Sequence, residues 1–134
     1  MEDKIINKLM KLNAKAIKNG DVPVSCIIVK NDKIISSAYN KRVLLNDPFS
    51  HAEIIAIRKA CKKLNTYNLS DCILYTTLYP CNMCMEVIKE SKINRVKYIL
   101  EKEKEINRKI NYEKMFVKDN YFKQELSNFF VDKR

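Results

Sequence analysis

The segment from residue 72 to residue 100 constrains the fold more than any other part of the sequence. It begins with "CILYTTL" (72–78), a short apolar run that predicts a strand. "PCNMCMEVIKES" (80–91) predicts a helix with Pro80 in its first turn, where proline is tolerated, and "RVKYIL" (95–100) predicts a second strand. A succession of strand, helix and strand implies a parallel pair joined by a right-handed crossover. We therefore expect an α/β layer structure with helices on both faces of a central sheet.

The segments before residue 72 fit the same layers. Apolar residues recur at helical spacing over 2–19, which predicts an amphipathic helix, and Gly20 stands where its C-terminal cap belongs. "PVSCIIV" (23–29) and "KIISSAY" (33–39) predict a hairpin with its turn at 30–32. A loop over 40–50 and a helix over 51–64 follow.

The segments after residue 100 are less regular. Residues 101–112 predict a short solvated helix or a loop, and residues 113–118 a last strand. A terminal helix is expected over 120–134, with a stripe that faces the core and consists of Phe122, Leu126, Phe129 and Phe130. With 134 residues, the chain has the size of one domain, 1–134.

Composition narrows the class of protein. No apolar run approaches the roughly 18–20 residues that span a bilayer, and the N-terminus does not resemble a secretory signal, so a cytoplasmic protein without membrane partners is expected. Cys26, Cys61 and Cys72 lie among apolar residues and are expected in the core. The net charge of +10 is spread along the chain. It fits a surface that binds nucleic acid and equally a lysine-rich surface that maintains solubility.

The candidate metal ligands are His51, which is the only histidine, and Cys81 and Cys84 of "PCNMC". Zinc takes imidazole and thiolate ligands in a tetrahedron, and three protein ligands leave a fourth position for water, as in catalytic sites. The predicted helices place all three residues at helix starts, whose partial positive charge favours thiolates.

Glu53 allows two interpretations. A carboxylate beside a metal-bound water can accept its proton and deliver it to a leaving group. Ser50 and Glu53 also form a capping-box pattern, in which the glutamate only satisfies a backbone donor.

The combination of "HAE" (51–53) and "PCNMC" (80–84) resembles the signature of zinc-dependent nucleobase deaminases. Within that group, the chain resembles the bacterial tRNA-specific adenosine deaminases in four stretches: "DVPVSCIIV", "NKRVLLNDPFSHAEIIAIRKAC", "DCILYTTLYPCNMC" and "LSNFFVDKR". It departs from that family at Tyr79, where glutamate is usual, and at Ser25, where glycine is usual.

The resemblance implies a three-layer α/β/α cytidine-deaminase-like fold with a mixed sheet of about five strands. It implies one Zn²⁺ per chain bound by His51, Cys81 and Cys84, with Glu53 as the proton shuttle. Asn40 would bind the flipped base, although a simple turn residue is the alternative at that position. The implied reaction converts adenosine to inosine at the first anticodon (wobble) position of tRNA, and the implied assembly is a homodimer.

Two other functions are also compatible with the sequence. One is deamination of a free base or nucleotide, such as guanine, cytosine or dCMP, because parts of the sequence resemble guanine and deoxycytidylate deaminases. The other is a zinc-stabilised module that binds nucleic acid without catalysis.

Overall fold

The computed structural model describes residues 1–101 and 110–132, and within them the strands form one mixed sheet. Its order is β2-β1-β3-β4-β5, where β1 is antiparallel to both β2 and β3, and β3, β4 and β5 are parallel. The expected parallel pair over residues 72–100 is therefore confirmed. The strand bounds are β1 Ser25–Lys30, β2 Lys33–Tyr39, β3 Ile73–Leu78, β4 Arg95–Leu100 and β5 Asn111–Lys114.

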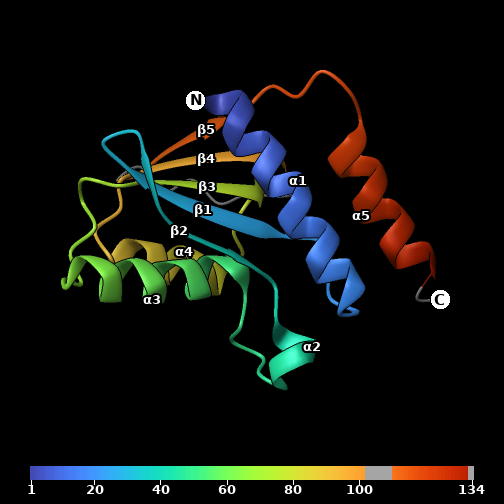
Figure 1. The fold of residues 1–134 in the computed structure, drawn as a ribbon, viewed down its shortest axis with the longest axis horizontal. Helices are drawn as coiled ribbons and strands as arrows, with labels where there is room; N and C mark the ends of the chain where they lie inside the picture. Colours follow the sequence, from blue (N-terminus) through green and yellow to red (C-terminus); the bar gives the residue numbers. More distant parts are fainter. Residues whose placement is uncertain (102–109, 133–134) are drawn as a thin grey trace.

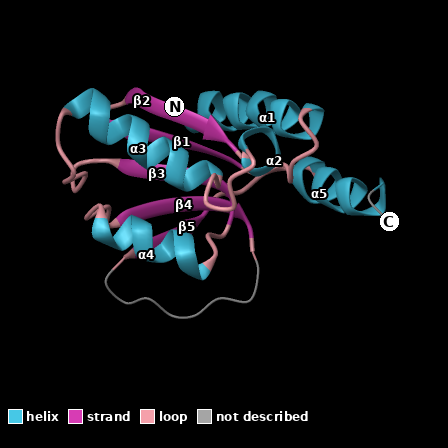
Figure 2. Cartoon of the chain, turned by 90° about the horizontal axis from the view of Figure 1, so that it is seen from below, coloured by secondary structure: helices cyan, strands magenta, loops and turns pink. Residues whose placement is uncertain are grey.

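Helices cover both faces of this sheet, as Figures 1 and 2 show. α3 and α4 lie on one face, and α1 and α5 lie on the other. The expected three-layer α/β/α arrangement is confirmed. No helix in the described part of the chain is both long and apolar enough to cross a membrane. The helix bounds are α1 Glu2–Lys18, α2 Arg42–Leu45, α3 Ala52–Leu64, α4 Asn82–Glu90 and α5 Tyr121–Asp132.

The turn between β1 and β2 explains why these residues form a hairpin. Asn31 and Asp32 both have left-handed backbone conformations, with φ of 49° and 62°. Asn and Asp tolerate this conformation better than other non-glycine residues, and two such residues in succession match the twist of a hairpin. The hairpin predicted around residues 30–32 is confirmed, with register running from Ser25↔Tyr39 to Lys30↔Lys33.

The sheet separates two hydrophobic clusters. Cys26, Ile28 and Leu74 point from the strands toward α3 and α4, where they pack with Ala56 and Ile88. On the other face, Ile5 and Leu9 of α1 pack against side chains at the alternate positions of the strands. These strand residues include Ile27, Tyr75 and Ile99.

The cysteines outside "PCNMC" occupy the core as expected. Cys26 and Cys72 are buried, and Cys61 is partly buried against the same cluster. Burial raises the pKa of all three thiols, so they remain protonated and behave as small apolar side chains.

Three boundaries differ from the prediction. The segment expected as a loop over 40–50 contains α2, and the last strand lies at Asn111–Lys114 instead of 113–118. Pro80 was expected in the first turn of the third helix, but Cys81 is the N-cap of α4 and Pro80 precedes it. The expected helix or loop over 101–112 falls largely on residues 102–109, which lie outside the described residues.

The aromatic stripe of the terminal helix is only partly a core face. Phe122 is buried at 2% exposure with Ile99 and Met115, whereas Phe130 is 51% exposed. The prediction is wrong for Phe130, because periodicity indicates a shared helix face but not how much of that face the rest of the protein covers.

Candidate metal centre

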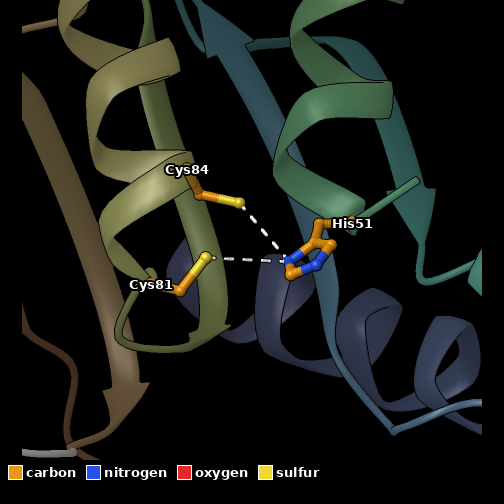
Figure 3. A group of neighbouring side chains, drawn as sticks. All are labelled: His51, Cys81 and Cys84. Atoms are coloured by element: carbon orange, nitrogen blue, oxygen red, sulfur yellow. Dashed lines mark hydrogen bonds between the residues drawn. The ribbon is translucent and has the colours of Figure 1, made fainter. Parts of the chain in front are cut away.

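His51, Cys81 and Cys84 come together where α3 and α4 begin. His51 is the N-cap of α3 and Cys81 the N-cap of α4, both with extended backbone conformation. Cys84 lies one turn further along α4, so its sulfur points to the same side as that of Cys81. Figure 3 shows both sulfur atoms directed at the imidazole ring of His51.

The distances between these side chains fit a tetrahedral zinc ion. The Nδ1 atom of His51 lies 3.8 Å from the Sγ of Cys81 and 3.6 Å from the Sγ of Cys84. Zinc bonds of about 2.3 Å to sulfur and about 2.0 Å to nitrogen place these atoms roughly 3.5–3.6 Å apart in a tetrahedron. All three ligand atoms lie within 4.8 Å of one another. The group therefore fits zinc through Nδ1 of His51.

The electrostatics of the site favour a cation. In the absence of a metal, the hydrogen bond with Cys81, burial and the nearby Glu53 carboxylate together raise the pKa of Cys84 far above its usual range. Groups that carry or acquire negative charge are thus crowded into a buried space. A bound cation removes this conflict, because it stabilises the thiolates that the metal-free site disfavours.

Glu53 lies beside this group in the first turn of α3 and is 4% exposed. Its negative charge is one of the causes that raise the pKa of Cys84, Cys26 and Tyr112. The carboxylate therefore lies in the interior, close to the metal-ligating group. Ser50 is not the N-cap that the capping-box interpretation requires. His51 is the N-cap, and the hydroxyl of Ser50 donates instead to Oδ2 of Asp47 at 2.7 Å.

Asn40 ties the end of β2 to the start of α3. It is 5% exposed, and its Oδ1 accepts a hydrogen bond of 2.9 Å from the backbone N–H of Ala52. The side chain thus caps α3 from a distant position, next to His51. Its oxygen already accepts one hydrogen bond, and its amide nitrogen can serve a ligand only as a donor.

Asp21 is a residue whose role sequence reasoning missed. Its side chain is fully buried, and its Oδ1 accepts hydrogen bonds from the Val22 N–H at 2.8 Å and from Nε of Arg42 at 3.4 Å. Its Oδ2 accepts the backbone N–H of Val43 at 2.9 Å. The carboxylate therefore holds α2 in place. No local pattern reveals this contact, because the partners are separated by about twenty residues of sequence.

A cluster of tyrosines packs next to the cysteine helix. The ring of Tyr79, two residues before Cys81, lies 4.9 Å from that of Tyr98 and 5.0 Å from that of Tyr112 between centroids. Burial raises the pKa of Tyr112, and the nearby Tyr79, Glu53 and Cys84 act in the same direction. Tyr79, which stands where glutamate is usual in the resembled family, thus belongs to a cluster of aromatic side chains next to the metal-ligating residues.

Residues 1–100 match the family model for the cytidine and deoxycytidylate deaminase zinc-binding region. The chain is 49% identical over 82 residues to the tRNA-specific adenosine deaminase of Aquifex aeolicus, covering 61% of this chain and 54% of that protein. It is 37% identical over 131 residues to the tRNA-specific adenosine deaminase of Buchnera aphidicola, covering 89% and 87%. It is 47% identical over 79 residues to the guanine deaminase of Bacillus subtilis, covering 59% and 51%. The matches thus span about half of two of these relatives and most of the third.

Solved structures with the same fold include one from studies of A-to-I editing by tRNA:A34 deaminases at the wobble position of transfer RNA. It matches with a TM-score of 0.76 and 25% identity, over 86% of this chain and all of that chain. The structure of Bacillus subtilis guanine deaminase matches with a TM-score of 0.70 and 38% identity, over 75% of this chain and 65% of that chain.

These similarities confirm the family suggested by "HAE" and "PCNMC". The family model covers residues 1–100, and the relative from Buchnera aphidicola matches over nearly its whole length. The chain belongs to the cytidine and deoxycytidylate deaminase family, and tRNA-specific adenosine deaminases are among its relatives.

Proposed function

We propose that this protein is a zinc-dependent deaminase that converts adenosine to inosine at the first anticodon (wobble) position of tRNA. The observation that carries the proposal is the near end-to-end similarity to a tRNA-specific adenosine deaminase, over 89% of this chain. The distances among His51, Cys81 and Cys84 add independent support, because they suit one zinc ion per chain. We further infer that residues 1–134 act as a single domain in the cytoplasm.

His51, Cys81 and Cys84 would hold the metal, which, when bound, supplies an activated water as the nucleophile. Glu53 would accept a proton as the new C6–O bond forms. The same carboxyl group would then deliver a proton to the departing amine, so that adenosine and water give inosine and ammonia. Its burial at 4% exposure limits exchange of that proton with bulk solvent.

Asn40 would orient the base. Its Oδ1 already accepts the Ala52 N–H, so the side chain would donate from its amide nitrogen to an acceptor atom of the purine. The adenosine must leave the stack of the anticodon loop to reach the site, which single-stranded RNA loops permit at modest cost.

The direct test is deamination of an anticodon stem-loop by the zinc-loaded protein. We expect inosine in a stem-loop with adenosine at the first anticodon position, read as guanosine on sequencing. A matched stem-loop in which that adenosine stands one position away from the first anticodon position should contain no inosine after the reaction. Free guanine, cytosine and dCMP are assayed in parallel by ammonia release. Turnover of a free base without turnover of the stem-loop would overturn the proposal.

Guanine deamination is the second candidate function. It is supported by the 47% identity to Bacillus subtilis guanine deaminase over 79 residues and by the matching structure at 38% identity. Ammonia release from guanine in the same assay, at a rate above that from the stem-loop, would favour it.

We also infer a homodimer, as the resemblance to the family implies. Exposed apolar side chains on α2, including Val43 and Leu44 at 55% and 54% exposure, are available for such a contact. Light scattering coupled to size exclusion should give twice the mass of the 15.8 kDa chain, and a monomeric mass at assay concentration would contradict the inference.

A further inference from the structure

A row of lysines runs along one side of α1, on the face of the sheet opposite α3 and α4. These side chains and the apolar Leu12 and Ile34 line a groove of about 780 Å³ between α1 and β2. Asn7 also contributes to its wall, and among the residues that the structure describes no acidic residue does. The lysines are Lys4, Lys8, Lys11 and Lys15.

This arrangement does not serve the stability of the helix. The lysines are three or four positions apart, so like charges face one another on neighbouring turns, which destabilises a helix. The acidic Glu2 lies elsewhere, since it pairs with Lys97 at 3.2 Å. No ion pair among the described residues neutralises the row. A surface that only maintains solubility would mix both signs of charge.

The spacing of the row suits a polyanion with regularly placed charges. Lys4 and Lys15 are eleven residues apart, which corresponds to about 16 Å along the helix axis. Lys4, Lys11 and Lys15 are exposed. The neighbouring side of α1 is buried in the core through Ile5, Leu9 and Leu12, so the apolar face of this helix is not available for insertion into a membrane. Nucleic acid therefore fits the groove better than a lipid surface.

The row leads toward the candidate metal centre. α1 ends next to Gly20 and Asp21, and Asp21 binds the backbone N–H of Val43 in α2. α2 is followed by the segment that delivers His51 to the site. Figure 1 shows the carboxyl end of α1 at the end of the molecule from which α2 projects.

We propose that the groove formed by Lys4, Lys8, Lys11 and Lys15 binds the sugar-phosphate backbone of structured RNA. It holds a helical stem while the adjoining loop enters the site at the starts of α3 and α4. This assignment rests on the proposed function, which makes RNA the substrate. It adds a second contact surface on the face of the sheet opposite α3 and α4.

The test compares two variants with the same change in net charge. In the groove variant, all four lysines of the row are replaced by glutamine. The control variant replaces four exposed lysines near the far ends of α3 and α4, namely Lys62, Lys63, Lys89 and Lys92. Binding is measured by fluorescence anisotropy over a range of KCl concentrations. The probe is a labelled tRNA with guanosine at the first anticodon position, which offers no adenosine there.

The groove variant should bind this tRNA at least about tenfold more weakly than the control variant. The slope of log K against log[KCl] should fall by about 2–4, because each lost phosphate contact removes about one unit. Equal binding by the two variants overturns the proposal. Retained RNA binding with lost binding to phosphatidylserine vesicles also overturns it, in favour of a membrane surface.

These outcomes are separable from the proposed function. The binding probe does not require deamination, and inosine formation by the unmodified protein is scored in its own assay. In addition, the groove variant should keep kcat on an anticodon stem-loop and show a raised KM, because the stem that adjoins the loop is the part held in the groove. A fall in kcat on the stem-loop, with folding intact by circular dichroism, contradicts a role confined to stem binding.

Discussion

The anchoring of α2 by Asp21 can be tested by replacing this residue with asparagine. The substitution keeps size and shape, and the asparagine oxygen can still accept the Val22 N–H, which lies 2.8 Å from Oδ1. The amide nitrogen then faces the backbone N–H of Val43, whose distance to Oδ2 is 2.9 Å, so a donor meets a donor. The ion pair with Arg42 is lost as well, although the arginine side chain is 39% exposed.

The expected loss follows from these contacts. A hydrogen bond to a charged group contributes about 1.5–3 kcal/mol, and a buried donor left unpaired costs about 1–3 kcal/mol. Both figures describe the loss of the same hydrogen bond in part, so they are not added in full. The ion pair with the half-exposed arginine adds less than about 1 kcal/mol because of solvent screening. We expect Asp21→Asn to lower the free energy of unfolding by about 2–4 kcal/mol. For a chain of this size, that lowers the melting temperature by roughly 6–16 °C.

The assay is urea unfolding followed by far-UV circular dichroism, at fixed zinc and protein concentration. The matched control is Asp71→Asn, which changes the same charge at an exposed position and should stay within about 0.5 kcal/mol of the unmodified protein. An Asp21→Asn variant that unfolds at the same urea concentration as the control would show that the three contacts do not contribute to stability.

Three further predictions concern the metal centre. Glu53→Ala should retain zinc and a native circular dichroism spectrum while losing ammonia release by at least about a hundredfold, and retained turnover would exclude the proton-transfer role. His51→Ala should fail to hold stoichiometric zinc by metal analysis after dialysis, whereas full occupancy would remove His51 from the ligand set. The apparent zinc affinity, measured by chelator competition, should fall between pH 8 and pH 6. The raised pKa of the metal-free Cys84 means that zinc must displace a proton from this thiol, and an affinity independent of pH would contradict this.

Elements with strong local signals could be predicted from the sequence. β3, α4 and β4 agree with the prediction to within about two residues at each boundary, because an apolar run, a proline and a serine mark their limits. Cys81 and Cys84 are three positions apart, which predicts that both side chains lie on the same face of one helical turn. The strand–helix–strand order predicts that this turn lies at one end of the sheet. Both features are local consequences of backbone geometry.

Features that depend on distant contacts could not be predicted. α2 buries none of its own side chains, and its backbone is bound by the distant Asp21. The cap of α3 comes from Asn40, not from Ser50 in the local motif. β5 is a short edge strand whose side chains are only half-buried or exposed, so its sequence carries little alternation of apolar and polar residues.

The two helix starts have a thermodynamic consequence. Neither His51 nor Cys81, as N-cap of its helix, makes a side-chain capping hydrogen bond, so neither side chain caps the helix that it begins. An ion held by both would join two segments thirty residues apart and would bind only the folded chain. Each tenfold rise in free zinc above the dissociation constant would then stabilise the fold by about 1.4 kcal/mol. The lifetime of the folded protein in a cell would accordingly depend on its zinc supply.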